Sequence, residues 1–258
     1  MSWNLRFAGD EPPHAWPDRR PLMRELIAQV APDIIGTQEG LFHQLEALRD
    51  DLDGYAWIGL GREGGSHGEN MAVFYRTSRL EPLAYDHFWL SDTPRTIGSM
   101  TWGNRYPRMV TIVRFREKTS GREFLLWNTH LDHEVETARE RSVDLILDRL
   151  AAVPPQLPVI LTGDFNAPAE QSPIYARLLE RGGFSDTWLA AEDRVGEGLD
   201  TFNGFRPGQH EGGRRIDWIL FRGAFTVSRA AILDFSRNGR YPSDHFPVVA
   251  WLVLSPDA

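Results

Sequence analysis

Two polar side chains that could do chemistry follow an apolar run in the middle of the chain. Residues 159–167 read VILTGDFNA, and the apolar run stops at Gly163, just before Asp164 and Asn166. A short apolar run that ends on a turn signal predicts a buried strand. Alternate side chains past its end point the same way, so a carboxylate and an amide can share one surface and polarise a water molecule. The alternative is an ordinary turn, which Gly, Asp and Asn also favour.

Further polar residues stand at or beside the ends of other predicted strands. An ordinary explanation exists for some of them: Glu39 would suit the first turn of a helix, and Asn4 an edge strand. Asp217 interrupts an apolar run, and a buried acid needs a partner. The set comprises Asn4, Glu39, His130, Asp217, Asp244 and His245, beside strands predicted at residues 2–7, 33–38, 123–129, 216–221 and 246–254.

The combined set is rich in oxygen donors and holds two histidines. Carboxylate and amide oxygens suit a hard divalent cation such as Mg²⁺ or Mn²⁺, whereas zinc prefers more histidine or thiolate. The chain has no cysteine, so disulfides and thiolate metal sites are excluded. These residues can act together only if the fold brings the strand ends to one edge.

The spacing of apolar residues predicts about a dozen strands and four main helices. Helices are expected over residues 17–30, from residue 40, over 134–150 and over 172–179. A strand at 80–90 is expected to join the group formed by strands at 55–60 and 71–75. Helices and strands alternate early and strands dominate late, which favours two packed sheets with helices outside. No linker divides the chain, so residues 1–258 are predicted to form a single domain.

Composition excludes several classes of protein. The chain of 258 residues carries 28 basic and 36 acidic side chains, a net charge of −8, so it lacks the basic surface of a protein that coats nucleic acid by charge. A nucleic-acid enzyme is still possible, because a bound metal can reverse the local field. No apolar run is long enough to span a membrane, and nothing predicts a membrane anchor or a signal peptide, so the expected compartment is the cytoplasm.

Six short stretches carry a resemblance to a known family. They are WNLR with Asn4, TQE with Glu39, NTHLD with His130, GDFNA with Asp164 and Asn166, RIDWI with Asp217, and SDH with Asp244 and His245. In this order the chain resembles the endonuclease/exonuclease/phosphatase superfamily, the metal-dependent phosphoesterases related to DNase I and the abasic-site endonucleases. The resemblance implies a DNase I-like four-layer α/β sandwich, two packed mixed β-sheets flanked by helices, with the active site along their joint edge.

The resemblance also implies roles for these residues. Glu39 would be the principal metal ligand, helped by Asn4 and Asp244. Asp164 and Asn166 would position or deprotonate the attacking water. His245, paired with Asp217, would stabilise the pentacovalent phosphate or assist proton transfer. His130 would contact the phosphate or protonate the leaving group, with Glu69 orienting it.

Two loops are expected to supply substrate contacts. The loops at residues 91–107 and 196–215 combine arginines with aromatic side chains, which could grip a phosphate and stack on a base or sugar. The predicted substrate-binding residues are Trp102, Arg105, Arg108 and Phe205. Without a basic stripe, a small or single-stranded phosphoester is favoured. A structure-specific DNA or RNA nuclease is the main alternative, and a binding protein without turnover is the third.

Overall fold

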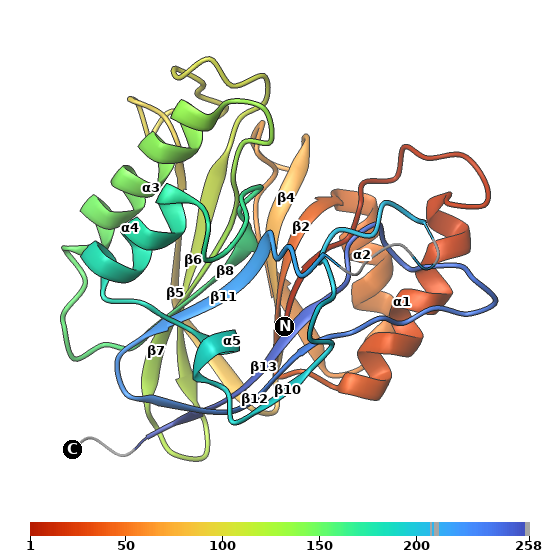
Figure 1. Cartoon of the computed structure of the whole chain (residues 1–258). Coiled ribbons are helices and arrows are strands. Elements are labelled where there is room, and N and C mark those ends of the chain that lie inside the picture. Colours follow the sequence, from red (N-terminus) through yellow and green to blue (C-terminus); the bar gives the residue numbers. More distant parts are fainter. Residues whose placement is uncertain (207, 209–211, 256–258) are drawn as a thin grey trace.

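The computed structural model describes residues 1–206, 208 and 212–255, whose strands form two mixed sheets packed face to face (Figure 1). The first sheet runs, in spatial order, β10 (Asp193–Val195), β12 (Phe225–Ile232), β13 (Val248–Leu254), β1 (Ser2–Asn4), β2 (Ile34–Leu41), β4 (Glu69–Arg76) and β3 (Tyr55–Ile58). The second runs β5 (Leu80–Trp89), β6 (Met109–Glu117), β7 (Glu123–His130), β8 (Val159–Asp164), β11 (Asp217–Arg222) and β9 (Ser185–Asp186).

Helices cover the outer face of each sheet. The helices are α1 (Trp16–Val30), α2 (Phe42–Asp51), α3 (Glu136–Leu150), α4 (Pro173–Gly182) and the short α5 (Thr187–Ala190). Helices α1 and α2 pack on the first sheet, and α3 and α4 on the second, at opposite sides of the molecule (Figure 1). This arrangement is the predicted four-layer α/β sandwich.

The alternation of side chains along a strand explains the layers. In β4, Phe74 packs with the α1 and α2 side chains, whereas its neighbours Val73 and Tyr75 pack between the two sheets. Successive residues of a strand point to opposite faces, so a strand covered on both sides is apolar throughout. The core between the sheets also takes Phe115 from β6 and Ile219 from β11.

The strand predicted at residues 80–90 forms, but its predicted grouping is wrong. As β5 it pairs with β6 in the second sheet and not with β3 or β4. Both edges of β4 are already occupied, by β2 and by β3, so no place beside β4 is left for the next strand. The outer edge of β3 stays without a neighbouring strand among the described residues, and the chain crosses to the other sheet after residue 76.

A polar cluster lies between the sheets among otherwise apolar residues. The amide of Asn128 on β7 donates to the carbonyl oxygens of Thr37 and Ala72 on the first sheet, at 2.8 and 3.0 Å. Its Oδ1 accepts from Gln38 Nε2 at 2.7 Å and from the Thr162 hydroxyl at 3.1 Å. Since buried polar groups are stable only when paired, this cluster fixes how one sheet sits on the other.

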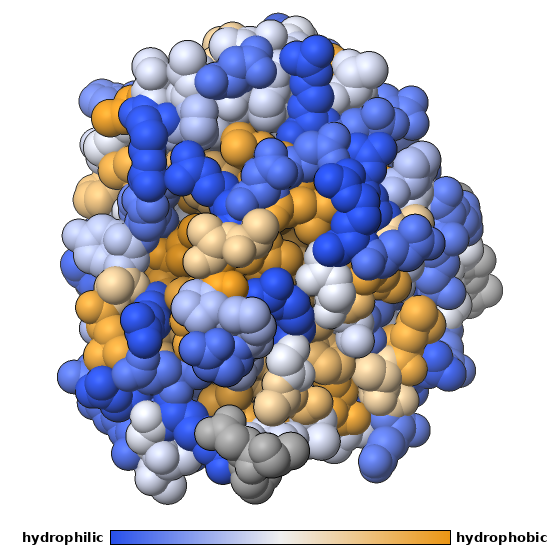
Figure 2. All heavy atoms as spheres, turned by 90° about the vertical axis from the view of Figure 1, so that its left-hand side faces the viewer, coloured by the Kyte–Doolittle hydropathy of each residue, from blue (hydrophilic) through white to orange (hydrophobic). Residues whose placement is uncertain are grey.

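The outer surface is mixed in character. Figure 2 shows the side of the molecule on which α3 and α4 lie, where hydrophilic side chains are spread widely and hydrophobic ones show between them. Among the described residues, no helix combines the length and apolarity that crossing a bilayer requires.

Candidate active site

Strand pairing explains why distant polar residues meet. On the first sheet β1 and β2 run parallel, with Asn4 opposite Gln38, the residue before Glu39. On the second sheet β7 and β8 run parallel, with His130 opposite Asp164, and β11 begins beside them with Asp217 opposite Asp164. Because parallel strands end at the same edge, their last side chains collect there. The two edges face one another across the sandwich.

The loop before β13 brings its residues to the same place. The Ser243 hydroxyl donates to the carbonyl of Asn4 at 2.6 Å, and Trp3 Nε1 donates to the carbonyl of His245 at 3.0 Å. The backbone N–H of Asn203 donates to the carbonyl of Asp244 at 2.7 Å. These hydrogen bonds hold the backbone of Asp244 and His245 next to β1, which fixes the positions of their side chains.

Three residues of the site have a left-handed backbone. Arg6 has φ 56° just beyond β1, Glu39 has φ 62° at the point where the β2–β4 register shifts, and Asn166 has φ 49° just beyond β8. Residues other than glycine rarely adopt this backbone conformation, which costs them on the order of 1–2 kcal/mol. Packing elsewhere must supply that energy, and such strain is common where a side chain has to be aimed at a site.

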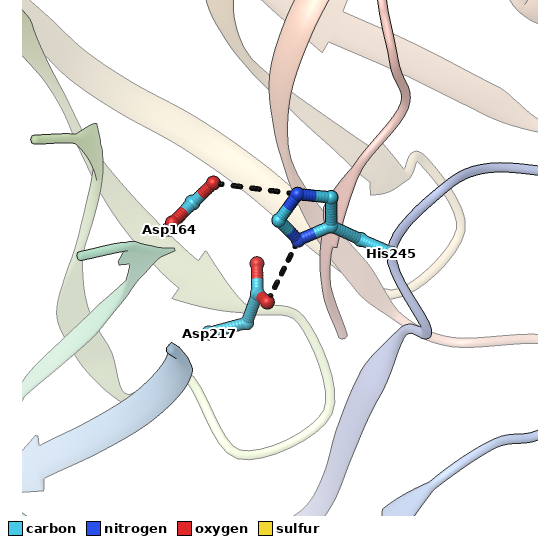
Figure 3. A group of neighbouring side chains, drawn as sticks. All are labelled: Asp164, Asp217 and His245. Carbon is cyan, nitrogen blue, oxygen red and sulfur yellow. Dashed lines mark hydrogen bonds and ion pairs between the residues drawn. The ribbon is translucent and has the colours of Figure 1, made fainter. Parts of the chain in front are cut away.

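Asp164, Asp217 and His245 form a group joined by one hydrogen bond and one ion pair (Figure 3). His245 Nδ1 lies 2.9 Å from Asp217 Oδ2, and its Nε2 lies 3.8 Å from Asp164 Oδ2. Burial opposes a charge on the imidazole, but the two carboxylates outweigh it and raise the pKa of His245 well above 6.5. Burial, together with the charge of Asp217, raises the pKa of Asp164 to about 7.

This group is better suited to proton chemistry than to metal binding. Its ligand atoms lie within 4.8 Å of one another, which would suit a cation on spacing alone. A histidine binds a metal only through a neutral ring nitrogen, however, and the two carboxylates beside His245 favour its protonated form. Asp217 holds one tautomer and orientation of the ring, as the carboxylate of a catalytic triad does.

His130 lies on the other side of Asp164. Its Nε2 is 3.0 Å from the amide nitrogen of Asn166 and 3.5 Å from Asp164 Oδ2. Burial, and next the charge of Arg108, lower the pKa of His130 well below 6.5. The ring is therefore neutral, and its buried Nδ1 has no hydrogen-bond partner among the described residues. The two histidines of the site thus carry different charges.

A third group of oxygen atoms lies at the end of the first sheet. The Glu39 carboxylate accepts from Asn4 Nδ2 at 2.9 Å and from the N–H of Phe7 at 3.3 Å. Asp244 lies 3.7 Å from Arg6, and burial raises its pKa, with the charge of Glu39 adding to the rise. Buried carboxylates that lie close together repel one another, and a hard divalent cation bound by them would neutralise their negative charge. Carboxylate oxygens are also the ligands that such a cation prefers, so the residues fit the ion.

Asn4 connects these groups. Its amide nitrogen donates to Glu39 at 2.9 Å and to Asp164 Oδ2 at 3.0 Å, while its Oδ1 accepts the N–H of Arg6 at 2.9 Å. In this orientation the amide holds the two carboxylates and turns its oxygen toward the backbone. Asn4 thus stands at the centre of the site, and its predicted role as a metal ligand stays a prediction.

Except for Asn4 and Asp217, which lie behind its wall, these residues line one cavity of about 680 Å³. Its wall combines acids, cations and aromatic rings from both sheets. The lining residues are Arg6, Phe7, Glu39, Arg62, Glu69, Tyr106, Arg108, His130, His133, Asp164, Asn166, Asp200, Phe202, Arg214, Ile216, Asp244 and His245.

The model of the endonuclease/exonuclease/phosphatase family matches residues 1–245. The chain belongs to this family. Its members include phosphatases and nucleases. Family membership leaves the ester itself open, because one fold serves several substrates.

Solved structures agree over the full length. A mannosyl-6-phosphatase from Bacteroides thetaiotaomicron is 35% identical, with a TM-score of 0.91 over 98% of both chains. An endonuclease/exonuclease/phosphatase family protein from the same bacterium is 34% identical, with a TM-score of 0.92 over 99% of this chain and 97% of that one.

Among curated proteins, Nocturnin from Drosophila melanogaster is 30% identical over 93% of this chain. The chain spans 42% to 61% of the length of the curated relatives it matches.

Not every residue expected to bind substrate in this family member lines the cavity. Arg108 does, but Trp102, Arg105 and Phe205 do not. Trp102 Nε1 donates to Asp92 at 2.8 Å, the Arg105 guanidinium lies over the Tyr106 ring, and Phe205 stacks on His14 at 4.2 Å.

The two loops expected to form the rim divide in the same way. Tyr106, Phe202 and Arg214 line the cavity, whereas Arg215 is buried in ion pairs with Asp186 and Glu170, both at 2.8 Å. Residues 207 and 209–211 of the second loop lie outside the described residues. Glu69 lines the cavity too, but its partner is Arg62, at 2.7 Å, and no contact joins it to His130 within the described residues.

Several lining residues carried no sequence signal of their own. Arg62 lies in the Gly-rich segment 61–70, and His133 and Asp200 lie in loops. The ion pair of Arg62 with Glu69 joins the two ends of this segment. A charged residue close to Glu69 in the sequence was the one available hint, because a buried acid needs a partner.

Proposed function

We propose that this protein is a divalent-metal-dependent phosphoesterase that hydrolyses a small or single-stranded phosphomonoester or phosphodiester by in-line attack of water. The observation that carries the proposal is the buried Asp217–His245–Asp164 group beside the Glu39 and Asp244 carboxylates in one cavity. Phosphoryl transfer needs charge stabilisation and an aligned nucleophile more than covalent help from the protein.

Mg²⁺ or Mn²⁺ is the cofactor that the donor set supports best. Glu39 and Asp244 would hold it, with Asn4 fixing the Glu39 carboxylate. When bound, the ion would neutralise negative charge on the non-bridging oxygens of the phosphate. The same carboxylates without a cation would repel an anionic substrate.

The remaining steps belong to the chain's own side chains. Asp164, with a pKa of about 7, is a base suited to neutral pH and would take the proton of a water that Asn166 helps to orient. His245 carries the positive charge that favours the crowded phosphate of the transition state. His130, neutral and close to Asn166, would hydrogen-bond a phosphate oxygen or the leaving group.

The size of the cavity and one relative support a small substrate. A volume of about 680 Å³ lies within the usual range of small-molecule sites. The mannosyl-6-phosphatase that is 35% identical acts, by its name, on a sugar phosphate. One observation favours a single-stranded nucleic acid as the second candidate. Phe202 is 49% exposed at the cavity and could stack on a base.

The test is a panel of esters with and without Mn²⁺. It would comprise p-nitrophenyl phosphate, bis-p-nitrophenyl phosphate, hexose 6-phosphates, and single- and double-stranded DNA and RNA. We expect metal-dependent release from at least one small ester, and Asp164→Asn and His245→Ala should each lower the rate by about 10²–10⁴-fold while the circular dichroism spectrum stays unchanged. Wild-type-like turnover in either variant, or no release from any ester, would contradict the proposal.

A further inference from the structure

Two buried arginines form one wall of the cavity. Arg62, from the segment between β3 and β4, is 6% exposed, and Arg108, directly before β6, is 4% exposed. Both line the cavity together with His130. Arginine is seldom buried so deeply unless its charge is matched.

Their neighbours hold the two guanidinium groups in place. Arg62 Nη1 donates to Glu69 at 2.7 Å, and the guanidinium lies over the Tyr106 ring, 4.7 Å from its centre. Arg108 Nη2 lies 3.0 Å from His133 Nδ1, and the His133 ring stacks on Tyr106 at 6.3 Å. The wall is therefore rigid, which lowers the entropy lost when a ligand binds.

These contacts leave donors unused. Within the described residues, the buried atoms Nε of Arg62, and Nε and Nη1 of Arg108, have no hydrogen-bond partner. Arg108 Nε forms a buried ion pair with Asp132 Oδ2 at 3.6 Å, but this distance is too long for a hydrogen bond, and that oxygen also has no hydrogen-bond partner among the described residues. The other oxygen of Asp132 is occupied by the N–H groups of Glu134 and Val135, at 3.0 and 2.7 Å.

A buried charged donor without a partner costs free energy that a ligand can recover. The two guanidinium groups also repel each other: burial first, and then the charge of Arg62, lower the pKa of Arg108. An anion with several acceptor oxygens and more than one charge would relieve both costs. A phosphate monoester offers three free oxygens and close to two charges at neutral pH, whereas a diester offers two oxygens and one charge.

We propose that Arg108, supported by Arg62, binds the extra oxygen and charge of a terminal phosphate, so that the substrates of this site are phosphate monoesters. This inference rests on the proposed phosphoesterase function and narrows its substrate class. Of the three free phosphate oxygens, one would lie on the Glu39 side of the cavity and one beside His130 and Asn166. The third would contact Arg108. A diester has no free oxygen for that position.

The test compares two esters that share a leaving group. Arg108→Met removes the charge at similar length, and Arg108→Lys keeps the charge but not the planar fork. Arg105→Met is the matched control, because Arg105 is an exposed arginine three residues away that does not line the cavity. For p-nitrophenyl phosphate, we expect Arg108→Met to lower kcat/KM about 100-fold and Arg108→Lys about 10-fold. For bis-p-nitrophenyl phosphate, both should change it less than about 5-fold.

A second measurement does not depend on turnover. Titration of the wild-type protein and Arg105→Met with inorganic phosphate in the presence of Mg²⁺ should give similar affinities, and Arg108→Met should bind at least about 10-fold more weakly. Equal losses on monoester and diester, or phosphate binding that Arg108→Met leaves intact, would overturn the monoester assignment while the enzyme stayed a phosphoesterase. Absence of turnover on every ester would instead overturn the function on which the assignment rests.

Discussion

At the scale of single residues, Asp217 shows most directly how the site is built. It lies in an apolar strand, is 1% exposed, and offers Oδ2 to His245 at 2.9 Å while Oδ1 has no partner within the described residues. Burying such a carboxylate costs free energy that the imidazolium of His245 has to recover. The pair thus fixes the tautomer, orientation and charge of the ring at once.

Replacing this carboxylate by its amide tests that role. Asp217→Asn keeps the size but removes the charge that sustains the imidazolium, so kcat should fall about 10²–10⁴-fold. The measurement is steady-state hydrolysis of p-nitrophenyl phosphate, with thermal unfolding as a check on the fold. Asp193→Asn, in an exposed ion pair with Arg229, is the matched control and should retain wild-type kcat. A rate within 5-fold of the wild type in Asp217→Asn would show that His245 does not need this partner.

The sequence contained enough to find the residues that end strands. Asp164, Glu39 and His130 could be selected because a polar residue that stops an apolar run is visible in a single sequence. Arg62 and His133 could not, because they lie in loops whose paths depend on tertiary contacts. Trp102 and Phe205 failed to line the cavity for the same reason, since their loops turn them toward Asp92 and His14.

At the scale of elements, the β6–β7 hairpin contains a local source of stability, the carboxylate of Glu117. Glu117, the last residue of β6, accepts the backbone N–H groups of Thr119 and Ser120 at 3.1 and 2.6 Å. Burial works against ionisation here, but these hydrogen bonds, chiefly from Ser120, lower the pKa of Glu117 to about 2. A carboxylate whose pKa is lower in the folded protein stabilises it above the unfolded pKa.

The stabilisation should therefore disappear in acid. Glu117→Gln should lower the free energy of unfolding by about 1 kcal/mol at pH 7, since a charge-assisted hydrogen bond is replaced by a neutral one. The difference from the wild type should shrink as the pH falls from about 4.5 toward 2, as Glu117 becomes protonated. Urea unfolding at pH 7 and pH 3.5 would measure it. A difference equally large at both values would rule out the carboxylate charge as its source.

The grouping of strands was harder to predict than the strands themselves. Residues 80–90 form a strand as expected, but nothing in their own sequence records that both edges of β4 are occupied. The polar cluster around Asn128 is another long-range feature. Asn128 lies in an otherwise apolar strand, and its partners Gln38 and Thr162 lie 90 and 34 residues away. The sequence around Asn128 shows that a polar residue in a buried strand needs hydrogen-bond partners. Only the tertiary structure shows which residues these partners are.

At the scale of the whole molecule, the site joins two halves of the sandwich. Glu39 ends a strand of the first sheet, and Asp164 and His130 end strands of the second. The six motifs, through the family resemblance that they carry, predicted that these strand ends form one site. The positions of the polar residues along the sequence only allowed such a site. The whole chain has a net charge of −8, to which these carboxylates contribute. A cation bound at the site should therefore stabilise the fold as well as serve the reaction.

Thermal unfolding with and without Mg²⁺ or Mn²⁺ would measure that stabilisation. A ligand that binds the folded state alone stabilises it by about 2.7 kcal/mol at one hundred times its Kd, which for a chain of this size raises Tm by about 5–10 °C. Glu39→Gln should lose most of the rise, because the amide cannot supply a charged ligand. Glu197→Gln, in an exposed ion pair with Arg194, should keep it. A rise that both variants share would place the ion elsewhere, and no rise in the wild-type protein would contradict a divalent cation at the joint edge of the sheets.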